Sequence, residues 1–390
     1  MLKGKTIVVA VCGSIAAVRS FDIVRQLRSS GAGVHVVMSS AAEGIITADA
    51  MQWASGNKVI TKLTGKTEHV QFFGKKGKAD LLLIAPATAN TISKIAMGID
   101  DSAITTFATI AIGSKKPVLI APAMHEPMYE HPIVQKNLGL LVDEKYVTII
   151  SPAIEEEKAK IAATERIVLE VEKALSRKLL EGKQILIANG ATYSQIDPMR
   201  IITNLGTGKT GVEIARQAYI NGAEVVMLHG TEHNKSLSSV LSELKNHAYD
   251  IFICPAAIGD FVAEQSREKI SSAKELHLKL KPAKKLLQEV RSKYPKLKIV
   301  AFKAETNKSK NQLIKIAKEF LRKNKFDLVV ANDVAKHPAG SDASEMFIVS
   351  AKKTVAGKQF SPTFSQKVVA VKGSKAKIAE KIVWETARLF

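Results

Sequence analysis

Gly13-Ser14-Ile15 follow an apolar segment near the start of the chain and lead into a helical pattern. A strand that ends in a glycine turn before a helix presents backbone N–H groups and the positive end of the helix dipole to an anion. The next predicted strand ends in Ser39-Ser40, where a dinucleotide enzyme has the Asp or Glu that binds ribose. The pattern argues against NAD and suits a mononucleotide such as FMN, with an ordinary tight turn as the alternative.

A second glycine-rich segment, Gly206-Thr207-Gly208-Lys209-Thr210-Gly211, matches G-x-G-x-x-G and contains G-K-T. A P-loop requires glycine where Thr203 stands. A Rossmann turn follows its strand directly, whereas about fifteen residues separate this segment from Asn189. The remaining prediction is a helix N-terminus that binds phosphate with Lys209 nearby, and a flexible glycine loop is the alternative.

Two further segments carry side chains suited to proton transfer or substrate binding. His69 precedes a predicted strand and has the side chain of a base that works near neutral pH, although lone histidines are more often structural. The segment from Pro122 to Tyr129 follows another predicted strand, at the edge where α/β proteins build their sites. For the second segment a rigid packed loop is an equal alternative.

The elements that must position these residues are short β-branched segments that alternate with helical patterns, which predicts parallel sheets covered by helices. A charged helical segment, 164–180, leads into Gly182, and this predicts a boundary near residue 181. We therefore expect an α/β fold of two doubly wound Rossmann-like domains, 1–180 and 181–390, with a last helix over 375–390. The predicted strands are 6–12, 34–39, 79–87, 117–123 and 147–151, then 184–189, 224–229, 250–255, 299–303 and 327–331.

Charge is the strongest feature of the composition of this 390-residue chain. Its 57 Lys and Arg against 37 Asp and Glu give a net charge of +20. Residues 1–180 hold 22 basic and 17 acidic residues (+5), which leaves 35 and 20 (+15) for 181–390. Such a field suits nucleic acid, an anionic membrane or small polyphosphates. Aromatic residues are only 5% and do not interleave with the basic ones, which disfavours nucleic acid.

The apolar segments and the cysteines exclude other classes. The longest apolar segments are shorter than the roughly 18 to 20 residues of a membrane helix, so no membrane span is expected. Cys12 and Cys254 lie far apart within predicted strands, which provides neither a disulfide framework nor a zinc site. The reducing cytoplasm is the compartment that fits.

The order of these motifs resembles one family along nearly the whole chain. The motifs are 13–17, His69, Ala85-Pro86-Ala87-Thr88-Ala89-Asn90, Pro122-Ala123-Met124 with Met128-Tyr129, Asp197-Pro198-Met199-Arg200 with Asn204, and Ala331-Asn332-Asp333-Val334. They resemble the bifunctional coenzyme A biosynthesis family, in which phosphopantothenoylcysteine decarboxylase is fused to phosphopantothenate–cysteine ligase. The resemblance implies that ligation precedes decarboxylation to phosphopantetheine.

For the first domain, the resemblance implies a flavodoxin-like flavoprotein with FMN at a subunit contact of a trimer. Flavin in this family oxidises the cysteine side chain of the substrate, so that carbon dioxide can leave, and His69 falls at the catalytic histidine. Met124, His125 and Met128 fall in the substrate loop. The implied flavin-binding residues are Gly13, Ser14, Ser39, Thr88 and Thr105.

Two departures from the family pattern concern the decarboxylase. His125 stands where the family often has an asparagine that contacts the substrate carboxylate, and a histidine can still donate a hydrogen bond there. The stretch 152–166, which matches a flap that often carries a proton-donating cysteine, has no cysteine but includes Lys158 and Lys160. A working ligase with a flavin domain of altered or lost decarboxylase activity is therefore the second hypothesis. A basic nucleic-acid-binding protein is the third.

For the second domain, the resemblance implies a ligase that uses a nucleoside triphosphate, commonly CTP, with Mg²⁺. Asn204 matches the asparagine tied to turnover of the acyl-nucleotide, and Lys269 begins a K-x-K-K motif that here reads Lys269-Ile270-Ser271-Ser272. Dimers through this domain and trimers through the first would together give a dodecamer. The implied substrate-binding residues are Arg200, Gly206, Gly208, Lys209, Ala257, Asp260 and Phe302, with Lys318 and Lys323 as candidates.

Overall fold

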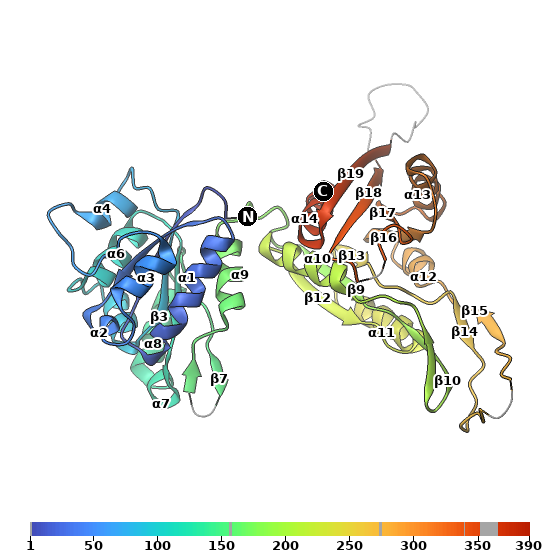
Figure 1. Ribbon diagram of the computed structural model, residues 1–390, viewed down its shortest axis with the longest axis horizontal. Coiled ribbons are helices and arrows are strands. Elements are labelled where there is room, and N and C mark those ends of the chain that lie inside the picture. Colours follow the sequence, from blue (N-terminus) through green and yellow to red (C-terminus); the bar gives the residue numbers. More distant parts are fainter. Residues whose placement is uncertain (1, 156–157, 273–274, 339, 352–365) are drawn as a thin grey trace. The chain divides into compact units, whose positions relative to one another are not determined.

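The computed structural model describes residues 2–155, 158–272, 275–338, 340–351 and 366–390. The chain divides into two compact units, Met1–Arg177 and Lys178–Phe390 (Figure 1). Among the described residues no helix combines the length and the apolar character that crossing a membrane requires.

The first unit is built on a parallel sheet of five strands in the order β2-β1-β3-β4-β6. The chain runs from β1 to β2 on one side and then to β3 on the other, so the strand order reverses between β1 and β3. In open α/β sheets this reversal is where ligands bind, beyond the carboxyl ends of the strands. The strands are β1 (Thr6–Val11), β2 (Gly33–Met38), β3 (Leu81–Ala87), β4 (Val118–Pro122) and β6 (Val147–Ile149).

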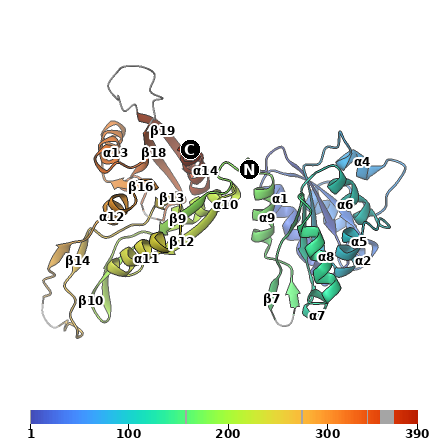
Figure 2. The same cartoon turned by 180° about the vertical axis from the view of Figure 1, so that it is seen from behind.

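Helices cover both faces of this sheet. One apolar core lies between the sheet and α1, α3 and α9, and the other lies beneath α5, α6 and α8, so β3 is buried along its whole length (Figures 1 and 2). The helices of the unit are η1 (Ile15–Arg19), α1 (Ser20–Ser29), α2 (Ser40–Glu43), α3 (Ala48–Ser55), α4 (Glu68–Phe73), α5 (Ala89–Ala96), α6 (Ala103–Gly113), α7 (Glu126–Tyr129), α8 (Pro132–Val142) and α9 (Thr164–Ala174).

The second unit has a seven-stranded sheet in the order β12-β9-β13-β16-β17-β18-β19. The first five strands are parallel, and β18 and β19 add an antiparallel edge that the sequence analysis did not predict. The strands are β9 (Gln184–Asn189), β12 (Glu224–His229), β13 (Ile251–Cys254), β16 (Lys298–Glu305), β17 (Leu328–Asp333), β18 (Ala343–Ala351) and β19 (Gln366–Ser374).

Five helices pack on the two faces of the second sheet (Figure 1). α13 shows why such segments become helical: Ser309 and Gln312 form a capping box, and Leu313, Ala317 and Leu321 recur every four residues on its buried side. The helices are α10 (Lys209–Ile220), α11 (His233–Asn246), α12 (Leu286–Lys293), α13 (Lys310–Asn324) and α14 (Lys375–Ala387).

Small β elements extend from both units. In the first, β5 (Met124–His125), β8 (Lys158–Lys160) and β7 (Ala153–Glu155) form a three-stranded sheet. In the second, β10 (Tyr193–Asp197) pairs with β11 (Arg200–Thr203), and β14 (Phe261–Ala263) pairs with β15 (Leu280–Pro282). Figure 1 shows β10, β14 and β15 projecting beyond the seven-stranded sheet.

All ten predicted strands are present, and the two Rossmann-like α/β folds are confirmed. The helix expected over 164–180 is shorter, because α9 ends at Ala174. In the second unit an antiparallel edge, β18 and β19, extends the predicted parallel sheet. Cys12 lies one residue beyond the end of β1 rather than within it.

Candidate functional site

Three hydroxyl side chains stand at the carboxyl ends of three neighbouring strands in the first unit. Ser14 follows β1, Ser39 follows β2 and Thr88 follows β3, and each is half-buried and caps the helix that comes next. Their oxygens accept hydrogen bonds from backbone N–H groups at 3.4, 3.2 and 3.4 Å. Three helix starts therefore meet at the reversal of strand order, which makes this edge suited to an anionic ligand.

Gly13 allows the turn after β1 to approach α2. A Cβ atom at this position would lie 2.4 Å from the Cβ of Ala41, closer than two such atoms can stand. The backbone of the Gly13-Ser14 turn therefore packs directly against the helix that Ser39 caps. Such a close approach is where glycine is required, and it brings two of the three hydroxyl caps together.

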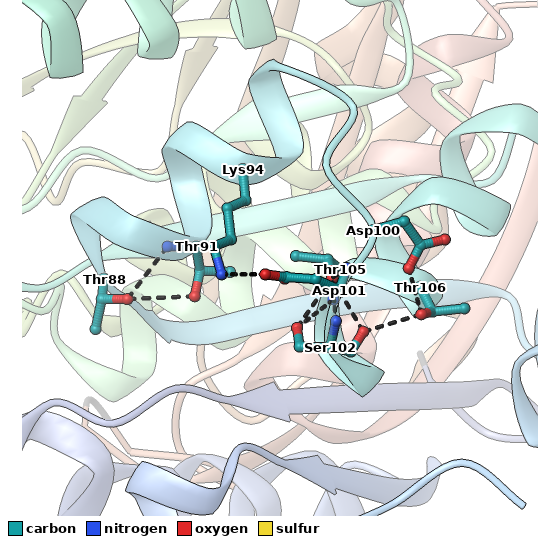
Figure 3. Close-up of polar contacts among 8 residues, drawn as sticks. All are labelled: Thr88, Thr91, Lys94, Asp100, Asp101, Ser102, Thr105 and Thr106. Atoms are coloured by element: carbon teal, nitrogen blue, oxygen red, sulfur yellow. Dashed lines mark hydrogen bonds and ion pairs between the residues drawn. The ribbon is translucent and has the colours of Figure 1, made fainter.

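The loop between α5 and α6 is held by a network of polar contacts (Figure 3). Lys94 forms an ion pair with Asp101 at 2.6 Å, and Thr106 hydrogen-bonds Asp100. Ser102 and Thr105 form a capping box at the start of α6.

The buried hydroxyl of Thr105 is committed to this cap. It accepts from the backbone N–H groups of Asp101 and Ser102, and it donates to the Ser102 carbonyl oxygen at 3.0 Å. The structure therefore brings together Ser14, Ser39 and Thr88, three of the predicted cofactor contacts, whereas the hydroxyl of Thr105 bonds within its own loop.

His69 lies in α4, which packs against α6. Its Nδ1 atom is buried and has no hydrogen-bond partner among the described residues. A buried ring nitrogen without a partner costs free energy, and such costs are commonly tolerated where a ligand completes the contact. A bound molecule that forms a hydrogen bond with this nitrogen would satisfy it.

The substrate loop and the flap are joined by β pairing. In β5 and β8, Met124 pairs with Ala159 and His125 pairs with Lys158. The side chains of His125 and Lys158 are both exposed. The flap that lacks a cysteine therefore places an amine directly across from the predicted substrate-binding residue, an arrangement that sequence spacing did not show. Met128, in α7, is 49% exposed.

In the second unit, the glycine loop leads into α10 as predicted. Gly208 caps the helix with φ +75°, a left-handed conformation that favours glycine. A Cβ on Gly206 would lie 2.7 Å from that of Ala257, and one on Gly211 would lie 2.1 Å from Oδ1 of Asn189. The loop therefore packs closely against the ends of β9 and β13, which leaves the first N–H groups of α10 near these strand ends.

Asn204 joins the glycine loop to the segment that follows β13. Its Nδ2 atom donates to the carbonyl oxygens of Ala257 at 3.4 Å and Ile258 at 3.2 Å. The nearby Asp260, 72% exposed, forms an ion pair with Lys285. The structure thus brings Asn204, Gly206 and Ala257 together, and it adds Lys285, which the sequence analysis missed.

Lys209 contacts a segment far along the chain. Its Nζ atom lies 2.9 Å from Oδ1 of Asp342 and 3.1 Å from the carbonyl oxygen of Gly340. Hydrogen bonding to Lys209, and then its positive charge, holds the pKa of the Asp342 carboxyl below its usual value. The lysine of the glycine loop therefore already has an anionic partner, one that a phosphate would have to replace.

The segment of Lys269 is fixed through its neighbour Ile270. Asp197 accepts a hydrogen bond from the Ile270 N–H at 3.2 Å, and Arg200 donates to the Ile270 carbonyl oxygen at 2.9 Å. The side chain of Lys269 is itself exposed. Arg200 therefore positions the Lys269 segment.

The remaining predicted substrate-binding residues, Phe302, Lys318 and Lys323, lie in different parts of the second unit. Phe302, in β16, is half-buried. Lys318 and Lys323 lie in the second half of α13, a helix that leads from the end of β16 back to the start of β17, so Lys323 is carried toward the opposite edge of the sheet. Among the described residues no group of three or more His, Cys, Asp or Glu could hold a metal ion.

Comparisons with known proteins match both units in turn. The Flavoprotein family matches residues 1–176, and the DNA/pantothenate metabolism flavoprotein C-terminal domain matches residues 180–387. The coenzyme A biosynthesis bifunctional protein CoaBC of Thermococcus kodakarensis is 44% identical over 364 residues, which cover 89% of each chain. This chain belongs to the CoaBC family.

A second relative and one solved structure are also similar to this chain. The protein of the same name from Methanocaldococcus jannaschii is 37% identical over 404 residues, covering 100% of this chain and 95% of its own. The solved DNA/pantothenate metabolism flavoprotein of Streptococcus pneumoniae is 22% identical, covers 54% of this chain and 100% of its own, and has a TM-score of 0.45. The family resemblance is confirmed: this is a bifunctional enzyme of coenzyme A biosynthesis with a decarboxylase-type flavoprotein domain and a ligase-type domain.

Proposed function

We propose that the enzyme first joins cysteine to phosphopantothenate at the expense of CTP, and then decarboxylates the phosphopantothenoylcysteine to phosphopantetheine with FMN. The relatedness to CoaBC proteins over nearly the whole chain supports this sequence of steps. The observation that carries it is a strand edge in each unit where helices begin, with hydroxyl caps in the first and a glycine loop in the second.

In the first domain, the flavin fits the cradle formed by Gly13, Ser14, Ser39 and Thr88. The missing Cβ of Gly13 keeps the backbone within reach of a phosphate group, and the helix starts after β1, β2 and β3 supply N–H donors. Bound FMN supplies the oxidation of the cysteine side chain that allows carbon dioxide to leave. Thr105 keeps the loop beside the flavin in shape through its capping box.

His69 acts as the base in this domain, because its unpartnered Nδ1 can take a proton from the substrate thiol. Met124, His125 and Met128 orient the substrate, and the β8 flap covers it. Protonation of the product then falls to a group other than cysteine. Lys158, which pairs with His125 across the flap, is the candidate that the register favours.

In the second domain, the nucleoside triphosphate binds at the start of α10, where Gly206, Gly208 and Lys209 contact its phosphates. Asn204 promotes turnover of the acyl-nucleotide, and Lys269 disperses charge that develops on the phosphates. The nucleotide and substrate contacts are completed by Arg200, Ala257, Asp260 and Phe302. Lys318 is a weaker candidate, and Lys323 is the weakest because it lies near the end of α13.

The remaining features of the proposal rest on general chemistry and on the family. Mg²⁺ enters with the nucleotide, because this ion is usually held by phosphate oxygens and one or two carboxylates. The enzyme assembles through trimers of the first domain and dimers of the second, up to a dodecamer. Exposed apolar side chains such as Ile15 (80%) and Leu205 (86%) support such contacts. Two free cysteines suit a cytoplasmic location.

One observation favours a second candidate function, in which the ligase works and the flavin domain has an altered or lost decarboxylase activity. The flap sequence 152–166 has no cysteine. The two functions differ in whether carbon dioxide is released and phosphopantetheine is formed.

A coupled assay separates them. Purified enzyme with phosphopantothenate, cysteine, Mg²⁺ and either CTP or ATP is followed for pyrophosphate and for carbon dioxide, beside the visible flavin spectrum. We expect both products and bound flavin. Pyrophosphate without carbon dioxide would establish the second candidate, and absence of both products would reject the ligase proposal.

A further inference from the structure

A pocket that the sequence analysis did not find lies in the second unit, at the carboxyl ends of β9 and β12. It is a small pocket, partly open to solvent, between these strand ends and the start of α11. One wall is Ile258, whose carbonyl oxygen accepts the 3.2 Å hydrogen bond from Asn204. The pocket therefore adjoins the segment that holds the asparagine proposed to act on the acyl-nucleotide.

The buried side chain of His233 indicates which kind of ligand this pocket binds. The residue is 4% exposed and lines the pocket from the first turn of α11. Its Nε2 lies 3.3 Å from the carbonyl oxygen of Lys284, which can only accept, so this nitrogen carries the hydrogen. In this tautomer Nδ1 is an acceptor, and it has no partner among the described residues. A donor from a ligand would satisfy it.

The remaining walls offer no cation to a phosphate group. Among the described residues no Lys, Arg, Asp or Glu lines the pocket; apolar contacts come from residues such as Leu237, Val240 and Leu286, and hydroxyl groups come from Thr192, Ser236 and Ser239. Oδ1 of Asn189, which is 2% exposed, is a second buried acceptor without a partner. Two unpartnered acceptors in a pocket that no described Lys or Arg lines disfavour an anion and favour a small, weakly polar donor.

We propose that this pocket receives the side chain of the cysteine that the ligase consumes, with the S–H group donating to Nδ1 of His233. This inference rests on the proposed ligase function. A thiol is a weak donor that behaves largely as a small hydrophobic group, so it loses little on leaving water for these walls. A serine hydroxyl loses more, and a methyl group leaves Nδ1 without a donor.

The test compares two nucleophiles of nearly equal shape. L-Cysteine and L-2-aminobutyrate differ only in an SH group where the second has CH₃. Their kcat/KM values are measured by pyrophosphate release, with saturating nucleotide, Mg²⁺ and phosphopantothenate. We expect the wild type to prefer cysteine by about tenfold, the usual effect of one buried hydrogen bond. Release of pyrophosphate by the wild type with cysteine first establishes the ligase itself.

Three variants make the test specific. His233→Phe keeps a ring but removes the acceptor, and we expect the preference to fall to about one. His233→Asn restores an acceptor near the position of Nδ1, and we expect much of the preference to return. His247→Phe, near the other end of the same helix and paired with Glu243 at 2.9 Å, is the control that should keep it.

The ratio does not depend on how much enzyme is folded, because both nucleophiles meet the same preparation. An unchanged ratio in His233→Phe would overturn the inference while leaving the ligase intact. A rise in KM for the nucleotide or phosphopantothenate, with the cysteine preference unaltered, would assign the pocket to that substrate and would also overturn it. A wild type without pyrophosphate release would instead reject the proposed function.

Discussion

The carboxylate of Asp197 accepts a hydrogen bond from the backbone N–H of Ile270, 73 residues later in the chain. The same side chain accepts from the N–H groups of Met199 and Arg200 at 2.8 and 2.9 Å. One carboxylate thus closes the β10–β11 hairpin and fixes the segment that begins with Lys269. The positioning of Lys269, which we propose to be catalytic, therefore depends on a carboxylate distant in sequence.

Asp197 predicts an acid limit for the ligase. The N–H of Met199, above all, holds the pKa of this carboxyl below its usual value of 3.8, and Ile270 and Arg200 add to the effect. The stabilisation is complete above 3.8 and is lost as the pH falls through the lower native pKa. Asp197→Asn should show reduced ligase activity at neutral pH and a smaller loss of thermal stability on acidification than the wild type. Parallel acid losses in both proteins would contradict this role.

The close packing at Gly13 leads to a prediction about flavin binding. Gly13→Ala places a Cβ 2.4 Å from that of Ala41, and overpacking of this kind costs about 1–3 kcal/mol. Because the strain falls on the turn proposed to hold the flavin phosphate, we expect less flavin absorbance per chain. Gly65→Ala is the matched control, since a Cβ there meets nothing within 4 Å. Equal flavin content in both variants would place the phosphate elsewhere.

His69 predicts a separation of the two activities. His69→Asn removes a base from the first domain only, and loss of general-base catalysis typically costs at least about a hundredfold in rate. Carbon dioxide release should fall accordingly, while pyrophosphate release by the same preparation serves as the internal control. A variant that decarboxylates at the wild-type rate would remove His69 from the mechanism.

The proposed role of Lys158 as proton donor to the product can be tested by substitution. Lys158→Gln keeps a polar side chain, one atom shorter, and the β8 pairing but removes the ammonium group. We expect slower carbon dioxide turnover with intact flavin binding and ligase activity. His125→Asn, which introduces the residue that the family often carries, should keep the decarboxylase active. Normal turnover in Lys158→Gln would exclude the amine as the donor.

Lys209 predicts nucleotide affinity rather than stability. Its ion pair with Asp342 is exposed, and such pairs contribute at most about 1 kcal/mol. Lys209→Met should therefore have the melting temperature of the wild type. Its KM for CTP should rise by about tenfold, because one charged contact to phosphate is lost. Lys293→Met, which breaks another exposed ion pair at similar exposure, should leave the KM unchanged. If Lys209→Met leaves the KM for CTP at the wild-type value, the phosphates bind away from this lysine.

The sequence by itself determined the strands of both sheets, because β-branched apolar segments that alternate with helical patterns have few other stable arrangements. It also determined the two glycine turns, where spacing and residue type limit the backbone. Its order of motifs was sufficient to identify the family.

Only the tertiary structure decided which of these residues meet. The β18–β19 edge was missed, since antiparallel pairing at an edge depends on long-range contacts rather than on local pattern. Likewise, the Asp342 partner of Lys209 and the pairing of Lys158 with His125 join segments distant in sequence. The unpartnered Nδ1 of His233 became visible only when α11 was packed against the ends of β9 and β12, because burial and hydrogen-bond satisfaction are properties of packed neighbours.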